Sequence, residues 1–141
     1  MLADIHDRLK ISGGPAFSGV EIAEDIDAFT ARAGQVDTGT VIVMPWREGA
    51  SKQSLATGGF RQRVAVQFLT GIVIRHYDHL MGGDRAVQFD ALKTQIEALL
   101  AGWEPPGAEP CELVGGESSP VTTGVSIYVQ TWETARFLTG E

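Results

Sequence analysis

The chain has 141 residues, of which 43% are hydrophobic and 21% are charged, and its formal net charge is −7. This length and composition indicate one globular domain, residues 1–141, and exclude a disordered tail, a fibre or a membrane protein. The negative net charge argues against a conventional nucleic-acid binder, because phosphate contacts need a clustered basic face.

Two short helices are predicted in the first forty residues. Apolar residues recur at helical spacing in two segments: Leu2, Ile5 and Leu9, then Ile22, Ile26, Phe29 and Ala33. The Ser-Gly-Gly-Pro sequence at 12–15 ends the first helix, and Gly34 ends the second. A short extended segment is expected at 17–21, between the two helices.

The middle of the chain predicts strands. Residues 38–44 are rich in β-branched side chains, and the strand is expected to end at Pro45, which cannot donate to a central ladder. Residues 47–59 are polar and rich in glycine and serine, which indicates a long loop or an extended hairpin arm. From 62 to 76, apolar residues alternate with others, which is typical of a long antiparallel strand with one fully apolar face.

The last third predicts one more helix and two strands. Asp84 is well placed to cap a helix that carries a continuous apolar stripe and ends at Gly102. A short strand near 111–114, a turn and a final strand from Val125 follow. The fold class expected is α+β, with about four strands in a mainly antiparallel sheet and the helices packed on one face.

Charged residues are unevenly distributed along the chain. Residues 1–40 hold seven acids and three bases, residues 41–77 one acid and five bases, and residues 78–141 ten acids and three bases. The basic middle segment could bind DNA, or it could meet an acidic surface on a neighbouring subunit. Folding could also mix these charges on one surface.

One group of residues has the chemistry of a metal site. His76, Asp78, His79 and Asp84 follow the long predicted strand, and such side chains can bind zinc or a transition metal. The spacing is a weak signal, because polar residues at a strand end beside a helix cap explain the same pattern. The glycine pairs at 13–14 and 58–59 lack the lysine and the strand-to-helix setting of a phosphate-binding loop. No catalytic residue, cofactor or bound metal is therefore expected.

Four further residues have a structural and a functional interpretation. Trp46, Trp103 and Trp132 lie at predicted element ends, where an aromatic residue can anchor an interface or fix its own loop. The two readings are equal for Trp46, and the intramolecular one is favoured for Trp103, between a helix end and Pro105. Cys111, the single cysteine, cannot form an internal disulfide and is expected to be a small buried side chain.

Several segments, in order, resemble one protein family. They are Val41-Ile42-Val43-Met44-Pro45, the polar loop, Arg61-Gln62-Arg63-Val64, Ala98-Leu99-Leu100-Ala101-Gly102-Trp103-Glu104-Pro105-Pro106, Glu112-Leu113-Val114-Gly115-Gly116 and Trp132-Glu133-Thr134. The chain from about Val41 onward resembles the tail terminator family of Mu-like phages and prophages, which is similar to the lambda-type tail terminator. The first forty residues resemble it less.

The resemblance implies a protein without catalysis that assembles with itself. Such a protein forms a ring, typically a hexamer, on the last ring of the phage tail tube and stops tube polymerisation. It then presents the surface that joins the tail to the head–tail connector protein, with DNA passing through the lumen without specific binding. Its expected location is the head-proximal end of the virion tail, with assembly in the host cytoplasm and no membrane.

The charge pattern suggests which residues make subunit contacts in such a ring. A head-to-tail contact closes into a ring when one face of a subunit complements a different face of the next. The candidate interface residues are Trp46, Arg47, Lys52, Arg61 and Arg63. The alternatives are a small metal-dependent enzyme that uses His76, Asp78, His79 and Asp84, and a monomeric binding module of a cellular system.

Overall fold

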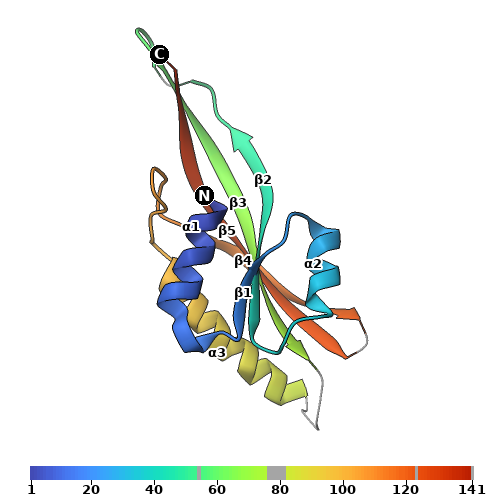
Figure 1. Ribbon diagram of the computed structural model, residues 1–141. Coiled ribbons are helices and arrows are strands. Elements are labelled where there is room, and N and C mark those ends of the chain that lie inside the picture. The colour runs from blue at the N-terminus through green and yellow to red at the C-terminus, as the bar shows by residue number, and fades with distance from the viewer. Residues whose placement is uncertain (54, 76–81, 123, 141) are drawn as a thin grey trace.

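The computed structural model describes residues 1–53, 55–75, 82–122 and 124–140, and its centre is one sheet of five strands in the order β1-β2-β3-β5-β4 (Figure 1). The strands are β1 Gly19–Ile22, β2 Thr40–Ala50, β3 Phe60–Arg75, β4 Glu112–Thr122 and β5 Val125–Gly140. β1 runs parallel to β2, and the other neighbouring pairs are antiparallel. The predicted α+β class is confirmed. β1, which arises from the extended segment expected at 17–21, is a fifth strand beyond the four expected.

Helices cover both faces of this sheet. They are α1 Leu2–Asp7, which continues through a π-helical turn at Arg8–Ser12 and a 3-10 turn at Gly14–Ala16, then α2 Ile26–Ala33 and α3 Gly82–Leu100. α1 and α3 lie on one face, whereas α2 lies on the other (Figure 1). The expectation that all helices share one face is therefore corrected. None of the described helices is both long and apolar enough to cross a membrane.

The two faces of β3 belong to two different apolar cores. The core under α1 and α3 includes Phe68, Ile72 and Trp132, and the core under α2 includes Leu69, Val73 and Phe29. Residues 68–74 are consequently all buried. The alternating pattern predicted one apolar face correctly, but the second face of β3 is apolar over this stretch and needs the cover that α2 supplies.

A glycine in β3 sets how closely α2 approaches the sheet. A Cβ built on Gly71 would lie 2.2 Å from the Cζ atom of Phe29, a separation that real structures do not tolerate. The ring of Phe29, which is 3% exposed, therefore occupies the space that a side chain at 71 would need. Helix α2 itself begins where the Asp25 carboxylate accepts a hydrogen bond of 2.8 Å from the backbone N–H of Ala28.

β2 continues through Pro45 to Ala50, so the predicted end of this strand at Pro45 is wrong. β1 pairs with β2 only as far as Val43. From Met44 onward β2 is an edge strand on that side, and a residue without an amide hydrogen is tolerated at an edge. The first four residues of the segment 47–59, which was expected to be a loop or a hairpin arm, are therefore strand, and β3 begins at Phe60.

The other elements of the last third are longer than the sequence pattern predicts. β4 runs through the glycines and serines of 115–119, where a turn was expected, and β5 continues to Gly140. α3 begins at Gly82, so Asp84 lies inside the helix rather than at its N-cap. The ends of β2, β3 and β5 project together beyond the helices as a narrow arm, which stands at the top of Figure 1.

Candidate assembly surfaces

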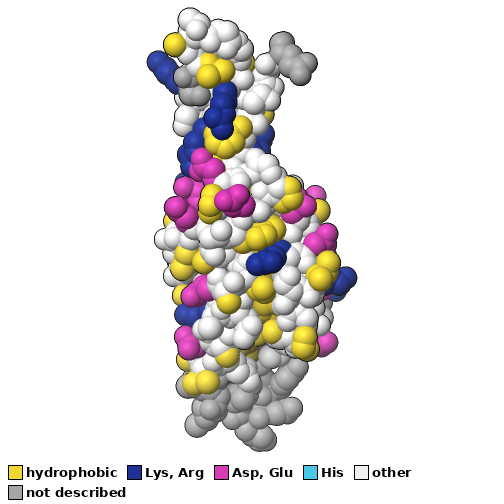
Figure 2. Space-filling model, turned by 90° about the vertical axis from the view of Figure 1, so that its left-hand side faces the viewer, with side chains coloured by type: hydrophobic (Ala, Val, Ile, Leu, Met, Phe, Trp, Pro, Cys, Tyr) yellow, Lys and Arg dark blue, Asp and Glu magenta, His cyan; other side chains and the backbone are white. Residues whose placement is uncertain are grey.

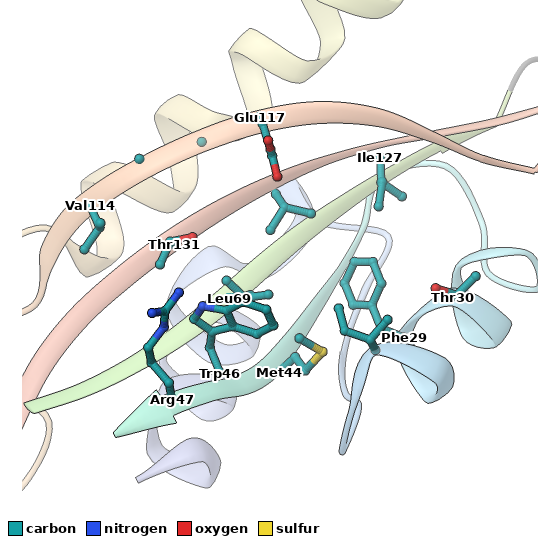
Figure 3. Close-up of a pocket in the computed structure, with 14 residues that line it drawn as sticks. Phe29, Thr30, Met44, Trp46, Arg47, Leu69, Val114, Glu117, Ile127 and Thr131 are labelled. Atoms are coloured by element: carbon teal, nitrogen blue, oxygen red, sulfur yellow. The ribbon is translucent and has the colours of Figure 1, made fainter. Parts of the chain in front are cut away.

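The face of the sheet that carries α2 is only partly covered, and an open groove of about 500 Å³ remains between α2 and β4. Its floor is Leu69 of β3 with Ile127, Val129 and Thr131 of β5. Figure 3 shows Phe29 and Ile127 at one end, and Trp46 and Arg47 on the side of β2. We call this region the α2-side groove.

Two β-bulges project side chains into this groove. The register between β2 and β3 shifts between Pro45 and Arg47, so Trp46 is an extra residue with no partner opposite. The register between β4 and β5 shifts in the same way around Val114. Because the first bulge adds Trp46 to β2, the consecutive residues Trp46 and Arg47 both line the groove, together with Met44.

The groove therefore exposes large apolar side chains to solvent. Trp46 is 44% exposed, Ile26 of α2 is 50% exposed and Val114 of β4 is 55% exposed. Gly115 also lines the groove, and a Cβ built there would meet no atom within 4 Å. These exposed apolar side chains come from three elements and line one groove, which makes the groove a candidate interaction surface.

Acidic residues flank the apolar part of the groove. Glu117 of β4 lines it directly, and a neighbouring hollow that shares Ile26 and Trp46 is lined by Glu24, Asp25 and Asp27. These carboxylates are exposed. The guanidinium of Arg47 lies over the ring of Trp46, 5.5 Å from its centroid, and is a basic group of the groove. The surroundings of the groove thus carry more acids than bases.

The arm has a different chemistry. It consists of residues 47–50 of β2, 60–63 of β3 and 136–140 of β5 with the described part of the connecting loop, and its outer end, the arm tip, is residues 51–53, 55–62 and 137–140. On the face shown in Figure 2, Lys and Arg side chains gather along the narrow upper part of the molecule, and Asp and Glu side chains lie mainly below it. The arm is thus the basic end of the protein.

Two ion pairs lie in the arm: one joins it to the segment before β4, and the other links its strands β2 and β5. Arg63 donates to the carboxylate of Glu109, with Nη2 and Oε2 2.8 Å apart, and Arg136 donates to Glu48 across the sheet, with Nε and Oε1 3.0 Å apart. Each hydrogen bond holds the pKa of its glutamate below the usual value. The charges of Arg63 and Arg136 are therefore already balanced within the chain.

The tip of the arm keeps its basic groups toward solvent. Lys52 is exposed in the loop, and the guanidinium of Arg61 lies 4.0 Å from the centroid of the Phe137 ring. The loop is shaped by Gln53, whose side chain accepts from the backbone N–H of Leu55 at 2.7 Å and donates to its carbonyl at 2.8 Å. Gly58 and Gly59 close the turn with φ of +64° and +84°, which confirms that this glycine pair is a turn.

The five residues predicted at a subunit interface fall into three places rather than one. Trp46 and Arg47 lie in the α2-side groove, Lys52 and Arg61 lie at the arm tip, and Arg63 lies between them in its pair with Glu109. Their role in an interface stays a prediction. The sequence pattern missed the groove residues Ile26, Val114 and Glu117, because the bulges and strand pairings that bring them together leave no local signal.

Trp132, Trp103 and Cys111 pack within the chain. Trp132 is fully buried and its indole N–H donates to the hydroxyl of Thr70 at 3.1 Å. Trp103 packs against the core with Arg8 over its ring, as the intramolecular interpretation predicts. Cys111 is 1% exposed, and burial raises the pKa of its thiol to about 11. The prediction of a small buried cysteine is confirmed.

The candidate metal ligands lie mostly outside the described part of the chain. His76, Asp78 and His79 are not among the described residues, and nothing is described of the Asp84 side chain. Within the described ranges, no cluster of three or more His, Cys, Asp or Glu side chains has the geometry to hold a metal ion.

Comparison with known proteins gives a family and solved structures with a similar fold. The model of the family described as "Phage tail terminator protein" matches residues 2–140. A chain of the solved structure described as "Virion of native gene transfer agent (GTA) particle" has a TM-score of 0.59 and 12% sequence identity, and the match covers 99% of this chain and 95% of that chain. At this identity the likeness shows a shared fold. A comparison with curated protein sequences gives no match.

Proposed function

Since this chain belongs to the phage tail terminator family, a family of structural virion proteins rather than enzymes, we propose that it caps the tail tube as a ring. In this role it binds the last ring of tube protein and ends tube polymerisation. The opposite surface of the ring then joins the tail to the head–tail connector. The proposed position is the head-proximal end of the tail, and the proposed ring is a hexamer. The match to the family model over residues 2–140 carries this proposal.

The distribution of surfaces supports self-assembly. A ring needs two different patches on each subunit that complement each other, because a patch that pairs with itself closes a dimer. This chain carries a basic arm at one end and an open apolar groove with acidic surroundings on the body. These two surfaces supply the unlike patches of a head-to-tail contact.

The net charge supports passage of DNA through the lumen. Specific or tight DNA binding gains most of its free energy from basic groups that neutralise phosphates. The chain has 18 acidic residues and 11 Lys and Arg residues. Two of those basic residues, Arg63 and Arg136, are paired with carboxylates in the chain. A ring of such subunits repels DNA on average, so DNA slides through without being held.

Electron microscopy of particles assembled without this protein tests the proposal. We expect tails longer than those of complete particles, or tails without heads, because tube growth would not stop at its set length. Expression of the wild-type chain during assembly should restore normal length and head joining, which is the control. Tails of normal length that are joined to heads in the absence of the protein would contradict the proposed function.

A further inference from the structure

We propose that the α2-side groove is the seat for the arm tip of a second copy of this chain, so that each subunit inserts its arm into the next. This inference rests on the proposed ring and names the contact that builds it. The groove leaves the apolar side chains of Trp46, Ile26 and Val114 exposed to solvent. Such side chains usually form the buried centre of an interface.

The arm tip carries an apolar patch that can supply this cover. Leu55 is 39% exposed, Phe60 is 38% exposed and Leu138 is 41% exposed. Phe60 and Leu138 share a face, because Gln62, two residues after Phe60, is the register partner of Leu138. Because these Phe and Leu side chains are exposed, they contribute little to the stability of their own chain. They would contribute free energy if a second subunit buried them.

The two apolar patches lie on opposite faces of the same sheet. Side chains alternate along β3, and Phe60 is an even number of residues before Phe68, whose side chain points to the core under α1 and α3. Leu69, on the floor of the groove, points to the α2 side. The patches therefore do not meet within one chain. The Phe60 and Leu138 face of one arm can therefore lie on the α2-side groove of the next subunit, and a head-to-tail ring requires two such different patches on each subunit.

The charges of the two surfaces are complementary. Among the described residues of the arm tip, the charged side chains are Lys52 and Arg61, and both are basic. Lys52 lies in the connecting loop, whereas Arg61, next to Phe60 in β3, points to the face opposite the Phe60 and Leu138 patch. Around the groove lie Glu117 and the acidic residues at the start of α2, which are Glu24, Asp25 and Asp27. Opposite charges at the edge of an apolar contact fix its orientation and favour the correct partner over a like-charged one. The arm tip of a second copy thus has the apolar and basic side chains that complement the groove.

Disulfide cross-linking between cysteine variants tests the contact. Phe60→Cys protein is mixed with Val114→Cys protein under mild oxidation, both in solution at high concentration and in tails assembled from the double variant. We expect a heterotypic disulfide dimer from the mixture and a ladder of covalent oligomers from the double variant. The native Cys111 does not compete, because it is 1% exposed.

The control replaces the groove position with an exposed apolar position on the other side of the molecule. Val87 of α3 is 70% exposed, and Phe60→Cys mixed with Val87→Cys should give at least tenfold less cross-linked dimer. Equal yields for the two mixtures, or no Phe60–Val114 product in either setting, would overturn the inference. A disulfide from Val114→Cys to the tube protein in assembled tails would assign the groove to the tube and overturn it as well.

A groove-filling variant gives an independent readout. Gly115→Leu places a side chain where a Cβ meets no atom within 4 Å, and Thr131, the register partner of Gly115, also lines the groove. We expect an unchanged melting temperature and at least a tenfold loss of the Phe60–Val114 cross-link, whereas Val87→Leu should change neither. A full cross-link yield in the filled groove would contradict the inference.

These outcomes separate the inference from the proposed function. A ring detected by native mass spectrometry without the Phe60–Val114 cross-link would overturn the arm contact and leave the capping role intact. Normal tail length in particles without the protein would overturn the capping role itself, whatever contact the arm makes.

Discussion

The body and the arm of this protein use the same strands for different purposes. In the body, β3 is covered on both faces, and residues 68–74 are all buried. In the arm, the same strand begins with exposed or half-exposed residues from 60 to 63. The body gains stability by burying apolar area, whereas the arm is held by strand pairing and by the ion pairs Arg63–Glu109 and Arg136–Glu48. Substitutions in the body should therefore change folding, and substitutions in the arm should change assembly.

The largest effect on folding is expected for Trp132→Ala in the body. Trp132 is fully buried in the same core as Phe68. Removal of its indole ring leaves a cavity and leaves the Thr70 hydroxyl without this hydrogen-bond partner. We expect a loss of about 3–5 kcal/mol in the free energy of unfolding, measured by chemical denaturation. Phe60→Ala in the arm is the matched comparison and should lose far less. Equal losses would show that the arm contributes to the core.

A smaller loss is expected where α2 packs on the sheet. Gly71→Ala would bring a Cβ within 2.2 Å of the Phe29 ring, so the helix or the ring must shift. We expect a loss of about 1–3 kcal/mol from this overpacking, measured in the same way. Gly115→Ala, at a position with open space, should be nearly neutral. A neutral Gly71→Ala variant would contradict the close approach of Phe29.

The arm should show the opposite behaviour. Lys52→Glu reverses an exposed charge at the arm tip and should change the free energy of unfolding by no more than about 0.5 kcal/mol. It should nevertheless lower the yield of rings in native mass spectrometry, because it replaces attraction to the acidic groove by repulsion. The double variant Lys52→Glu with Glu117→Lys should recover part of that yield. If the Lys52→Glu variant formed rings with the wild-type yield, the charge of Lys52 would have no role in the contact.

The smallest effect concerns pH and the base of the arm. The hydrogen bond from Arg63 lowers the pKa of Glu109 from its ordinary value of 4.5. A carboxylate whose pKa is lowered in the folded state stabilises the fold above its ordinary pKa, and this contribution is lost as the pH falls through the lowered pKa. Glu109→Gln should therefore show a smaller drop in melting temperature than wild type between pH 5 and about pH 3. Identical acid profiles would show that the pair contributes nothing to stability.

Local patterns alone predicted much of this protein. The order of the helices and of strands β2 to β5, the α+β class, the buried Cys111 and the intramolecular role of Trp103 follow from spacing and composition, whereas β1 was not counted among the strands. The sequence also predicts that charge is separated along the chain, and the basic segment 41–77 indeed contains most of the arm. These properties depend on residues close together in the sequence, which is the information that a periodic pattern carries.

Only the tertiary structure decided where the surfaces lie. Pro45 is tolerated inside β2 because β1 stops opposite Val43. Trp46 and Val114, each at a bulge in a different strand, line the same groove. Arg63, whose charge was expected to face a neighbour, is balanced by Glu109 from a distant segment. Each of these results depends on pairing between residues far apart in the sequence. A local sequence pattern carries no information about such long-range pairing, so only the folded structure reveals the groove.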